Sequence, residues 1–360
     1  LNAKDQAAAC SVLDLSEPAD TLSLPDGVTS ARIAEIRPSP VASDVIAAVL
    51  SGAEEESRLV VWNRRDPSLI STKVGQKGSF GFSWSPSGDL VAIAGKDKTL
   101  RVIDPRKENT GQISAHDSPR SFKTIWIDEQ HIISTGHGMG SLRQIKLYRL
   151  QRNSGNIELK VLKSLSLDNS PAILFPHYDE DTNVLWLWSK GERSVSAFEV
   201  QPEKPSELLT ALPAFQAGTP QVAMAFLPKR HANVKAVEIA ASYRLSSKDV
   251  QRVGFTFSRA RPELFQDDIF VPTRDVETPL CSAEEWVAGS NPEPKLISLQ
   301  PEGMMPRKWA AIASIADGRL ISLDLQSRKP LQSRPRPSYQ KVRSRRSSRT
   351  RRRKTTFWTV

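Results

Sequence analysis

Short apolar runs separated by turn residues dominate the hydrophobic pattern of the chain, and helical periodicity is scarce. The runs are rich in Val, Ile, Leu and aromatic residues, and turn sequences such as Pro-Ser-Gly, Gly-Lys-Asp and Asp-Pro bound them. Short strands at such spacing indicate an all-β sandwich, barrel or propeller. The pattern predicts strands at residues 31–36, 45–50, 58–62, 80–84, 90–94, 100–103, 124–127, 131–134, 144–150, 183–188, 194–200, 221–226, 236–243 and 252–257.

An internal repeat favours the propeller among these architectures. The clearest unit, residues 79–104, reads as strand, Ser-Pro-Ser-Gly-Asp turn, strand, Gly-Lys-Asp-Lys turn and strand. Units of the same order lie at residues 31–62 and 122–148, and two looser units lie at 172–200 and 221–257. A repeat of about 40–45 residues, stretched by insertions, is typical of four-stranded propeller blades. The first-strand aromatics step by 42, 49 and 51 residues along Trp84, Trp126, Phe175 and Phe226.

Short signatures at the ends of these units indicate the WD-repeat type. Trp-Asn at 62–63 and Ile-Asp at 103–104 sit where a WD repeat has Trp-Asp, and His116 sits where it has the His of Gly-His. We therefore expect His116 at a blade junction, hydrogen-bonded to a Ser or Thr of a neighbouring blade. Five units are visible, and residues 10–25 resemble the outer end of a sixth. Because a propeller commonly has about seven blades, we expect the amino-terminal blades to be missing from this chain.

The net charge of +10 belongs to one end of the chain rather than to the repeats. No acidic residue follows Asp324, and residues 328–354 contain thirteen Lys and Arg, so the rest of the chain carries 10 − 13 = −3. A segment of Arg interleaved with Ser, Thr and Pro cannot bury a core, so it is predicted to be disordered. The overall charge is therefore weak evidence for a nucleic-acid partner.

Several segments, in this order, resemble the coronins, which are actin-associated propeller proteins. Residues 95–106 resemble the family stretch that ends in Lys-Leu-Arg-Val-Ile-Asp-Pro-Arg. Residues 134–147 resemble the Thr-Thr-Gly and Arg-Gln segments of the next blade, and 178–183 resemble an acidic turn, with Glu180 where Pro is often found. Residues 227–245 resemble the last blade. Residues 264–269, 284–286 and 296–299 resemble the carboxy-terminal extension that packs against a coronin propeller.

The resemblance covers roughly residues 31–300 and implies a seven-bladed WD-repeat β-propeller, incomplete in this chain. Residues 1–260 are assigned to about five to six blade units, 261–305 to the extension, and 306–360 to a linker and the disordered tail. The amino-terminal signature of the family is absent, and residues 328–360 show no heptad pattern for its usual coiled coil. Coronins with two propellers in one chain lack that coil, so a piece of such a tandem protein fits both departures.

No constellation of residues predicts an enzyme, a cofactor or a metal site. The run Gly136-His-Gly-Met-Gly140 precedes a predicted strand, whereas a phosphate-binding loop must open a helix, so a tight turn is the favoured interpretation. His131 and His137 have neither helical nor zinc spacing. The run 179–181 lacks the Gly of a calcium loop and is predicted to be a solvated turn. Two cysteines, Cys10 and Cys281, form no disulfide framework and favour a reducing compartment.

Basic residues at turns and strand ends are the candidate binding site. The resemblance implies filamentous actin as the partner, and actin has an acidic surface that clustered cations would attract. The competing interpretation of each residue is an ordinary solvated charge. The candidate actin-binding residues are Arg64, Arg65, Lys96, Lys98, Arg101, Arg106, Lys229 and Arg230.

The favoured function is actin-filament binding and organisation of the actin cytoskeleton in the cytoplasm, without catalysis. One alternative is a propeller scaffold for actin regulators or membrane-trafficking complexes. A less favoured alternative is nucleic-acid association through residues 328–354 alone. No apolar run approaches the roughly 20 residues that span a bilayer, so no membrane span is expected.

Overall fold

The computed structural model describes residues 11–13, 21–23, 32–42, 44–51, 57–64, 69–75, 78–107, 110–153, 156–204 and 207–308. Cys10, Arg65 and the basic segment 328–354 lie outside these ranges. The described residues form antiparallel β-sheets with two 3-10 turns and one short α-helix, which confirms the all-β class.

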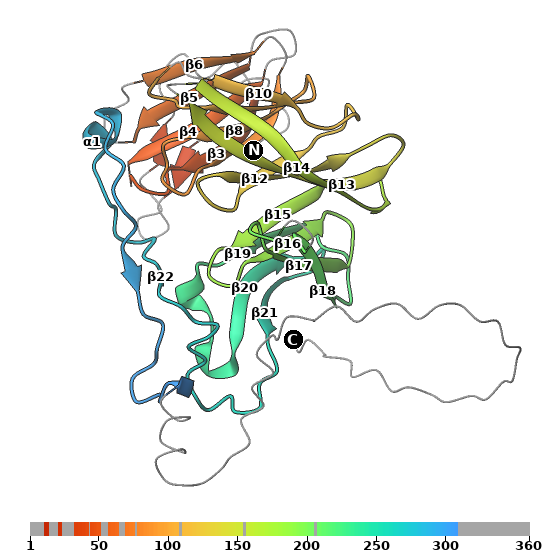
Figure 1. Ribbon diagram of the computed structural model, residues 1–360, viewed down its shortest axis with the longest axis vertical. Helices are drawn as coiled ribbons and strands as arrows, with labels where there is room; N and C mark the ends of the chain where they lie inside the picture. Colours follow the sequence, from red (N-terminus) through yellow and green to blue (C-terminus); the bar gives the residue numbers. More distant parts are fainter. Residues whose placement is uncertain are drawn as a thin grey trace, which may run out of the picture.

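Five consecutive sheets form five propeller blades (Figure 1). The first four have four strands in sequence order, and the fifth has three among the described residues. Blade 1 contains β3 (Arg32–Pro38), β4 (Val45–Ser51), β5 (Ser57–Asn63) and β6 (Leu69–Gly75), and blade 2 contains β7 (Ser79–Trp84), β8 (Val91–Gly95), β9 (Thr99–Ile103) and β10 (Thr110–Ser114). Blade 3 contains β11 (Lys123–Trp126), β12 (His131–His137), β13 (Leu142–Asn153) and β14 (Asn156–Asn169). Blade 4 contains β15 (Leu174–Asp179), β16 (Val184–Ser189), β17 (Ser194–Val200) and β18 (Leu209–Gln216), and blade 5 contains β19 (Ala223–Phe226), β20 (Glu238–Leu245) and β21 (Val250–Thr256).

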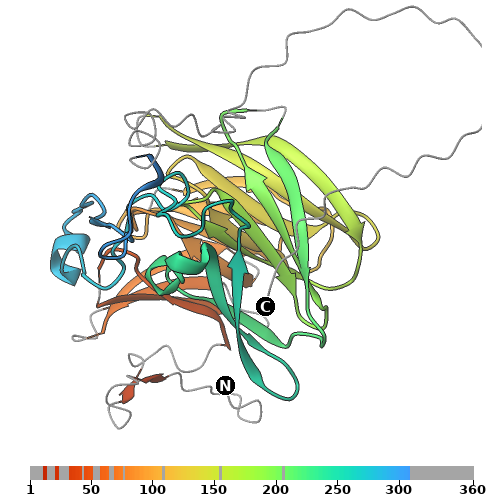
Figure 2. The ribbon, with the colours of Figure 1, turned by 90° about the horizontal axis from the view of Figure 1, so that it is seen from below.

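The first three strands of blades 1, 2, 3 and 5 match the predicted strands within a few residues, as do β16 and β17 of blade 4. The first strand of blade 4, β15, and the fourth strands were not predicted. Strands such as β8 and β16 are buried along almost their whole length, so their sequences read as apolar runs. By contrast, β14 and β18 are mostly exposed or half-buried, and their sequences mix polar and apolar residues. Figure 2 shows the long β13–β14 hairpin, in yellow-green, at the outer side of the blades. An outer strand has too little buried surface to produce a clear hydrophobic signal.

The first strands of neighbouring blades lie side by side around a common axis. The Lys123 ammonium of β11 donates to the Glu35 carboxylate of β3 at 3.2 Å and to the Phe80 carbonyl of β7 at 3.1 Å. His177 of β15 stacks on Phe226 of β19, with ring centroids 4.1 Å apart. Lys123 also lies over the Phe175 ring of β15, 5.8 Å from its centroid. Together these contacts join the first strands of five successive units, which is the arrangement expected of a propeller.

Apolar side chains between adjacent blades form the core. Blades 2 and 3 pack through a cluster that includes Leu100, Trp126 and Tyr148, and blades 3 and 4 pack through one that includes Ile145 and Leu185. Because each cluster is shared by two sheets, a single blade cannot bury its own apolar faces, and the core depends on stacking.

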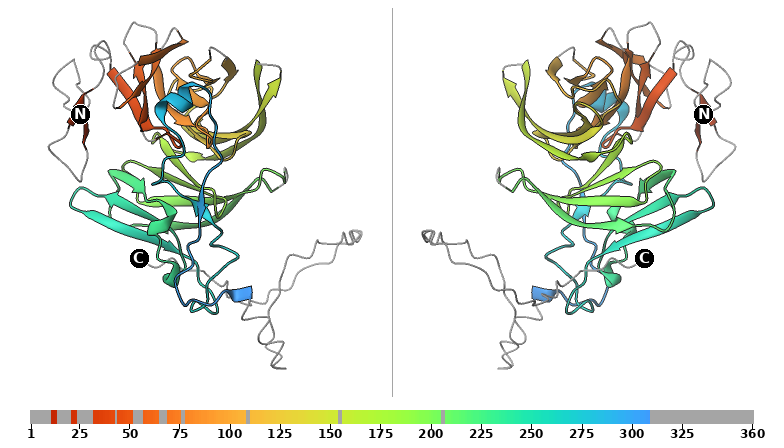
Figure 3. Two further views of the ribbon diagram at one scale, coloured as in Figure 1. Left: turned by 90° about the vertical axis from the view of Figure 1, so that its left-hand side faces the viewer. Right: turned by 90° about the vertical axis from the view of Figure 1, so that its right-hand side faces the viewer.

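The segment after blade 5, residues 261–308, runs along one end of the blades (Figure 3, left, blue). It contains β22 (Thr273–Arg274), α1 (Ala283–Val287) and β23 (Leu296–Ile297). Phe265, Ile269 and Phe270 join the core between blades 4 and 5, whereas Cys281, Ala283 and Trp286 join the core between blades 1 and 2. We call residues 261–308 the extension. Its two buried parts connect the last described blade to the first.

The remaining described strands are β1 (Ser11–Leu13) and β2 (Thr21–Ser23), which pair with each other as a two-stranded sheet. They fall where the sequence suggested the outer end of a sixth blade. Five blades are present in the described chain, within the predicted five to six units. The seven-bladed ring stays a prediction.

Candidate protein-interaction surface

The strand order separates the blade loops into two faces. Turns between the first and second strands of each blade, and between the third and fourth, lie at one end. The extension crosses this end: Leu280 donates to the Val41 carbonyl at 2.9 Å, and Arg274 donates to the Pro86 carbonyl at 2.7 Å. We call this end the extension face. Turns between the second and third strands, and the connections between blades, lie at the other end, which we call the opposite face. The seven candidate basic residues in the described ranges are divided between these faces.

Arg106 lies on the extension face and contacts the extension directly. Its guanidinium lies over the Trp286 ring, 5.3 Å from the centroid, and donates to the Asn291 side-chain oxygen at 2.9 Å. Its Nε atom donates to Asp104 at 3.2 Å, and only 5% of the side chain is exposed. The geometry gives Arg106 an intramolecular role and leaves little of it for a partner.

Lys229 and Arg230 lie in a turn of blade 5 on the same face. Lys229 forms an ion pair with Asp179 of blade 4, and both side chains are buried, at 8% and 9% exposed. Its ammonium also donates to the Ile239 carbonyl at 2.6 Å. Arg230 forms an ion pair with Glu277 of the extension. These two cations therefore join blade 5 to blade 4 and to the extension.

Arg64, at the end of β5, also lies on the extension face. Its Nε atom is 3.5 Å from an Asp44 carboxylate oxygen, and a third of its side chain is exposed. Arg65, the next candidate in the sequence, falls outside the described ranges.

The β8–β9 turn places Lys96, Lys98 and Arg101 on the opposite face. Arg101 forms a bidentate ion pair with Asp97, so these two charges neutralise each other. Lys96 and Lys98 are exposed, and Lys98 donates to the Asp117 carbonyl at 2.6 Å. A left-handed backbone at Lys98, φ +66°, completes this turn. The turn therefore carries two exposed positive charges.

Arg120 is a basic residue of the opposite face that the sequence reasoning missed. It is exposed and donates to the Pro171 carbonyl at 3.2 Å. It follows Asp117 in the connection between blades 2 and 3, so it lies beside the Lys98 turn. The four groups Lys96, Lys98, Arg120 and Asp117 give this patch a net charge of +2. No periodic pattern marks Arg120, because its position depends on how two blades meet.

His116 anchors the same connection, as the sequence predicted. Its Nε2 atom is 2.8 Å from the Ser134 hydroxyl of blade 3, and Ser134 is 3.1 Å from the Tyr148 hydroxyl. Burial, with the nearby Lys146 and His137 charges, lowers the pKa of His116 to about 3. The imidazole is therefore neutral at physiological pH and serves to fix the loop that carries Asp117 and Arg120.

The acidic run 179–181 leads into the predicted turn, but it is less solvated than the sequence predicted. Asp179 is buried against Lys229, and Glu180 accepts two hydrogen bonds from Arg274 of the extension, at 3.0 and 3.2 Å. Asp181 borders a central cavity of about 470 Å³. The turn was predicted correctly, but the burial of Asp179 was not, because the residues that cover it come from blade 5, far away in the sequence.

Replacing Asp181 with asparagine should reduce the loss of stability as pH rises. Burial raises the pKa of Asp181 from 3.8 to about 6, against a hydrogen bond from Thr273 and with repulsion by Asp179. Because the folded state favours the protonated form, its stabilising contribution is present below about pH 4 and is lost as pH rises through about 6. Urea midpoints of the two proteins at about pH 5 and pH 7.5 measure this. If the urea midpoint changed between the two pH values by the same amount in both proteins, the prediction would be contradicted.

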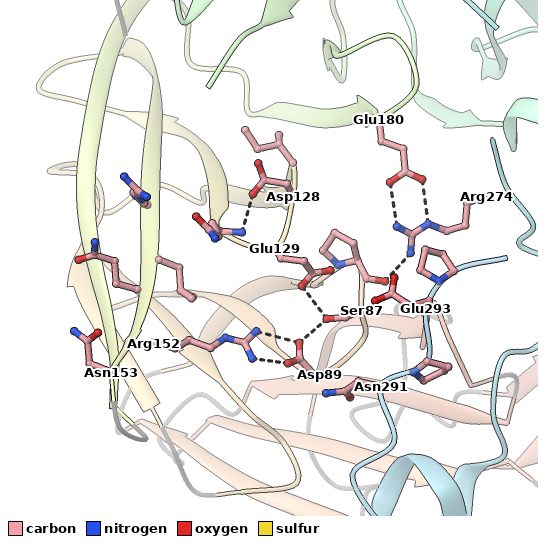
Figure 4. A pocket seen from close by; sticks show the side chains of 18 residues that line it. Ser87, Asp89, Asp128, Glu129, Arg152, Asn153, Glu180, Arg274, Asn291 and Glu293 are labelled. Atoms are coloured by element: carbon pink, nitrogen blue, oxygen red, sulfur yellow. Dashed lines mark hydrogen bonds and ion pairs between the residues drawn. The ribbon is translucent and has the colours of Figure 1, made fainter. Parts of the chain in front are cut away.

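Figure 4 shows a groove of about 840 Å³ where the extension meets blades 2, 3 and 4. Four of its charged side chains form two ion pairs: Arg152 with Asp89 at 2.7 Å, and Arg274 with Glu180. Ser87 joins Asp89 to Glu129 through hydrogen bonds of 2.7 and 2.8 Å. The groove is therefore a polar seam that holds the extension against the blades.

The described side chains give no reactive constellation. No three His, Cys, Asp or Glu groups in the described ranges are placed to hold a metal ion. The 136–140 run ends strand β12 and forms the turn into β13, with the Gly138 amide donating to the Leu142 carbonyl at 2.9 Å. Among these residues, no helix has the length and apolar character that crossing a bilayer needs.

Blades of this order, with a His116–Ser134 junction, define a WD-repeat β-propeller. A family model described as a type of WD40 repeat matches residues 250–294. The crystal structure of the WD40 domain of Toxoplasma gondii coronin is similar, with a TM-score of 0.68 and 26% identity over 80% of this chain and 71% of that one.

Sequence relatives identify the particular family. Coronin-7 of Bos taurus is 31% identical over 294 residues, which are 80% of this chain and 31% of that protein. Coronin-7 of Homo sapiens is 31% identical over 76% of this chain and 29% of its own length. The matched region is a coronin-family WD-repeat propeller. The chain spans about a third of the length of these relatives.

Proposed function

We propose that this propeller binds actin filaments through the opposite face, with Lys96 and Lys98 supplying the attraction, and that it organises the actin cytoskeleton without catalysis. The observation that carries the proposal is the division of the basic residues between the faces. The extension engages Arg106 and Arg230 directly, and Lys229 pairs with a buried carboxylate, whereas Lys96 and Lys98 remain exposed. The coronin resemblance supports actin as the partner.

The positive charge of the opposite face is complementary to an acidic protein surface. Asp97 is neutralised by Arg101, so the β8–β9 turn presents the two lysines without a competing carboxylate of its own. Exposed charges at the rim of an interface mainly raise the association rate, and salt screens them. Binding should therefore weaken as ionic strength rises.

Reversing both charges, as Lys96→Glu with Lys98→Glu, should weaken filament binding about tenfold at low salt. Co-sedimentation with actin filaments over a range of salt concentrations measures this. Lys204→Glu with Lys235→Glu is the matched control, because both lysines are exposed on the extension face and the change in net charge is the same.

Two outcomes would overturn the proposal. The unmodified protein remaining in the supernatant at low salt would remove actin as the partner. Equal losses in the two double variants would show that total charge matters and that the opposite face is not the binding surface.

A further inference from the structure

Met139 is an apolar side chain that the fold leaves in water. It is 86% exposed, whereas the next most exposed large hydrophobic residue in the described ranges, Val250, is 64% exposed. It lies at the tip of the turn between β12 and β13, in the Gly-Met-Gly sequence, and therefore on the opposite face. Flexible thioether side chains of this kind are common at adaptable protein-binding surfaces.

The backbone on both sides of Met139 is fixed, so its position is defined. The Gly138 amide donates to the Leu142 carbonyl at 2.9 Å, and a Cβ at Gly138 would lie 2.6 Å from the Gln144 amide nitrogen. Gly140 has φ +72°, which a residue with a side chain rarely adopts. His137 is buried and its Nε2 atom donates to the Ser170 carbonyl at 3.0 Å.

The turn that carries Met139 is joined to the basic patch of the opposite face. The Ser118 amide donates to the His137 carbonyl at 3.2 Å, which links this turn to the loop that contains Asp117 and Arg120. The Arg120 guanidinium also lies 3.5 Å from the Ser141 hydroxyl in the same turn. Lys98 donates to the Asp117 carbonyl from the other side. The turn with the apolar tip is therefore next to Arg120, and the loop that contains Asp117 connects it to Lys98.

We propose that Met139 is the apolar anchor of the partner interface and enters an apolar pocket with a carboxylate rim on the partner protein. The inference rests on the proposed function and names the part of the surface that would slow dissociation of the complex. Interface centres are enriched in Met and Arg and depleted in Lys, which fits a central Met139 with Lys96 and Lys98 at the rim. The lysines would accelerate encounter, and burial of Met139 would slow dissociation.

Met139→Ser should weaken co-sedimentation with actin filaments about tenfold, because the transfer of this side chain out of water is lost. Its dependence on salt should stay that of the unmodified protein. Met139→Leu, which restores apolar volume, should bind nearly as tightly as the unmodified protein. Leu162→Ser is the matched control, since Leu162 is 46% exposed on the outer strand of the same blade.

The outcomes separate the two proposals. If the unmodified protein sediments with filaments and Met139→Ser binds equally well, the Met139 anchor alone is overturned. Equal losses in the Ser and Leu variants, or in Leu162→Ser, would also overturn it. If the unmodified protein did not sediment with actin filaments, both the Met139 anchor and the proposed actin binding would be overturned.

Discussion

Replacing Trp286 with alanine should lower the free energy of unfolding by about 3–5 kcal/mol. Trp286 is fully buried at the far end of the extension, in the core between blades 1 and 2. Its ring packs edge-on against Trp84 at 5.9 Å, its indole N–H donates to the Gly88 carbonyl at 2.9 Å, and Arg106 lies over its face. Alanine would leave a cavity, an unpaired carbonyl and a guanidinium without its aromatic partner.

Urea denaturation followed by circular dichroism measures this loss without relying on the fluorescence of the deleted indole. Val287→Ala is the matched control, because Val287 is the next residue of α1 and is 51% exposed. We expect the control to change stability by less than about 1 kcal/mol. A Trp286→Ala protein as stable as the control would contradict the idea that the extension completes the core.

Lys229→Met should also be strongly destabilising, by about 3–5 kcal/mol, because it leaves the buried Asp179 carboxylate without its counter-charge. Thr182 would still donate to Asp179 at 2.5 Å, but a hydroxyl supplies no positive charge. The Ile239 carbonyl would lose its ammonium donor as well. The expected defect is therefore in folding, although the sequence suggested Lys229 as a binding residue.

Two measurements distinguish these roles. The urea midpoint should fall for Lys229→Met and stay nearly unchanged for Lys235→Met, which removes an exposed lysine from the same region of blade 5. A second substitution, Asp179→Asn in the Lys229→Met background, should restore part of the stability because it removes the uncompensated charge. Normal stability of Lys229→Met with a loss of filament binding would reverse this assignment.

These predictions divide the propeller into a face used for assembly and a face available for recognition. On the extension face, Arg106, Lys229, Arg230 and Arg274 form contacts between blades or with the extension. On the opposite face, the exposed cations and Met139 form no comparable contact with the extension. Selection of binding residues by charge alone therefore mixed two classes of arginine and lysine with different roles.

The strands, the repeat and the WD-repeat class could be read from the sequence because their signals are local. An inner strand buried on both faces must be apolar along its length, and the turns between strands need Gly, Pro, Asp or Asn at fixed places. The His116 junction was found for the same reason, since its position follows from the end of a repeat. The outer strands β10, β14 and β18 were not predicted because partial exposure removes the apolar run.

Only the tertiary structure decided which basic residues remain free, because their partners are distant in the chain. Arg106 meets Trp286 across 180 residues, and Lys229 meets Asp179 across 50. A charge next to a turn has the same local sequence whether it meets solvent or a buried carboxylate. The sequence by itself determined the class of fold and the family, whereas the folding of the extension over one end of the blades determined which cations form contacts within the chain.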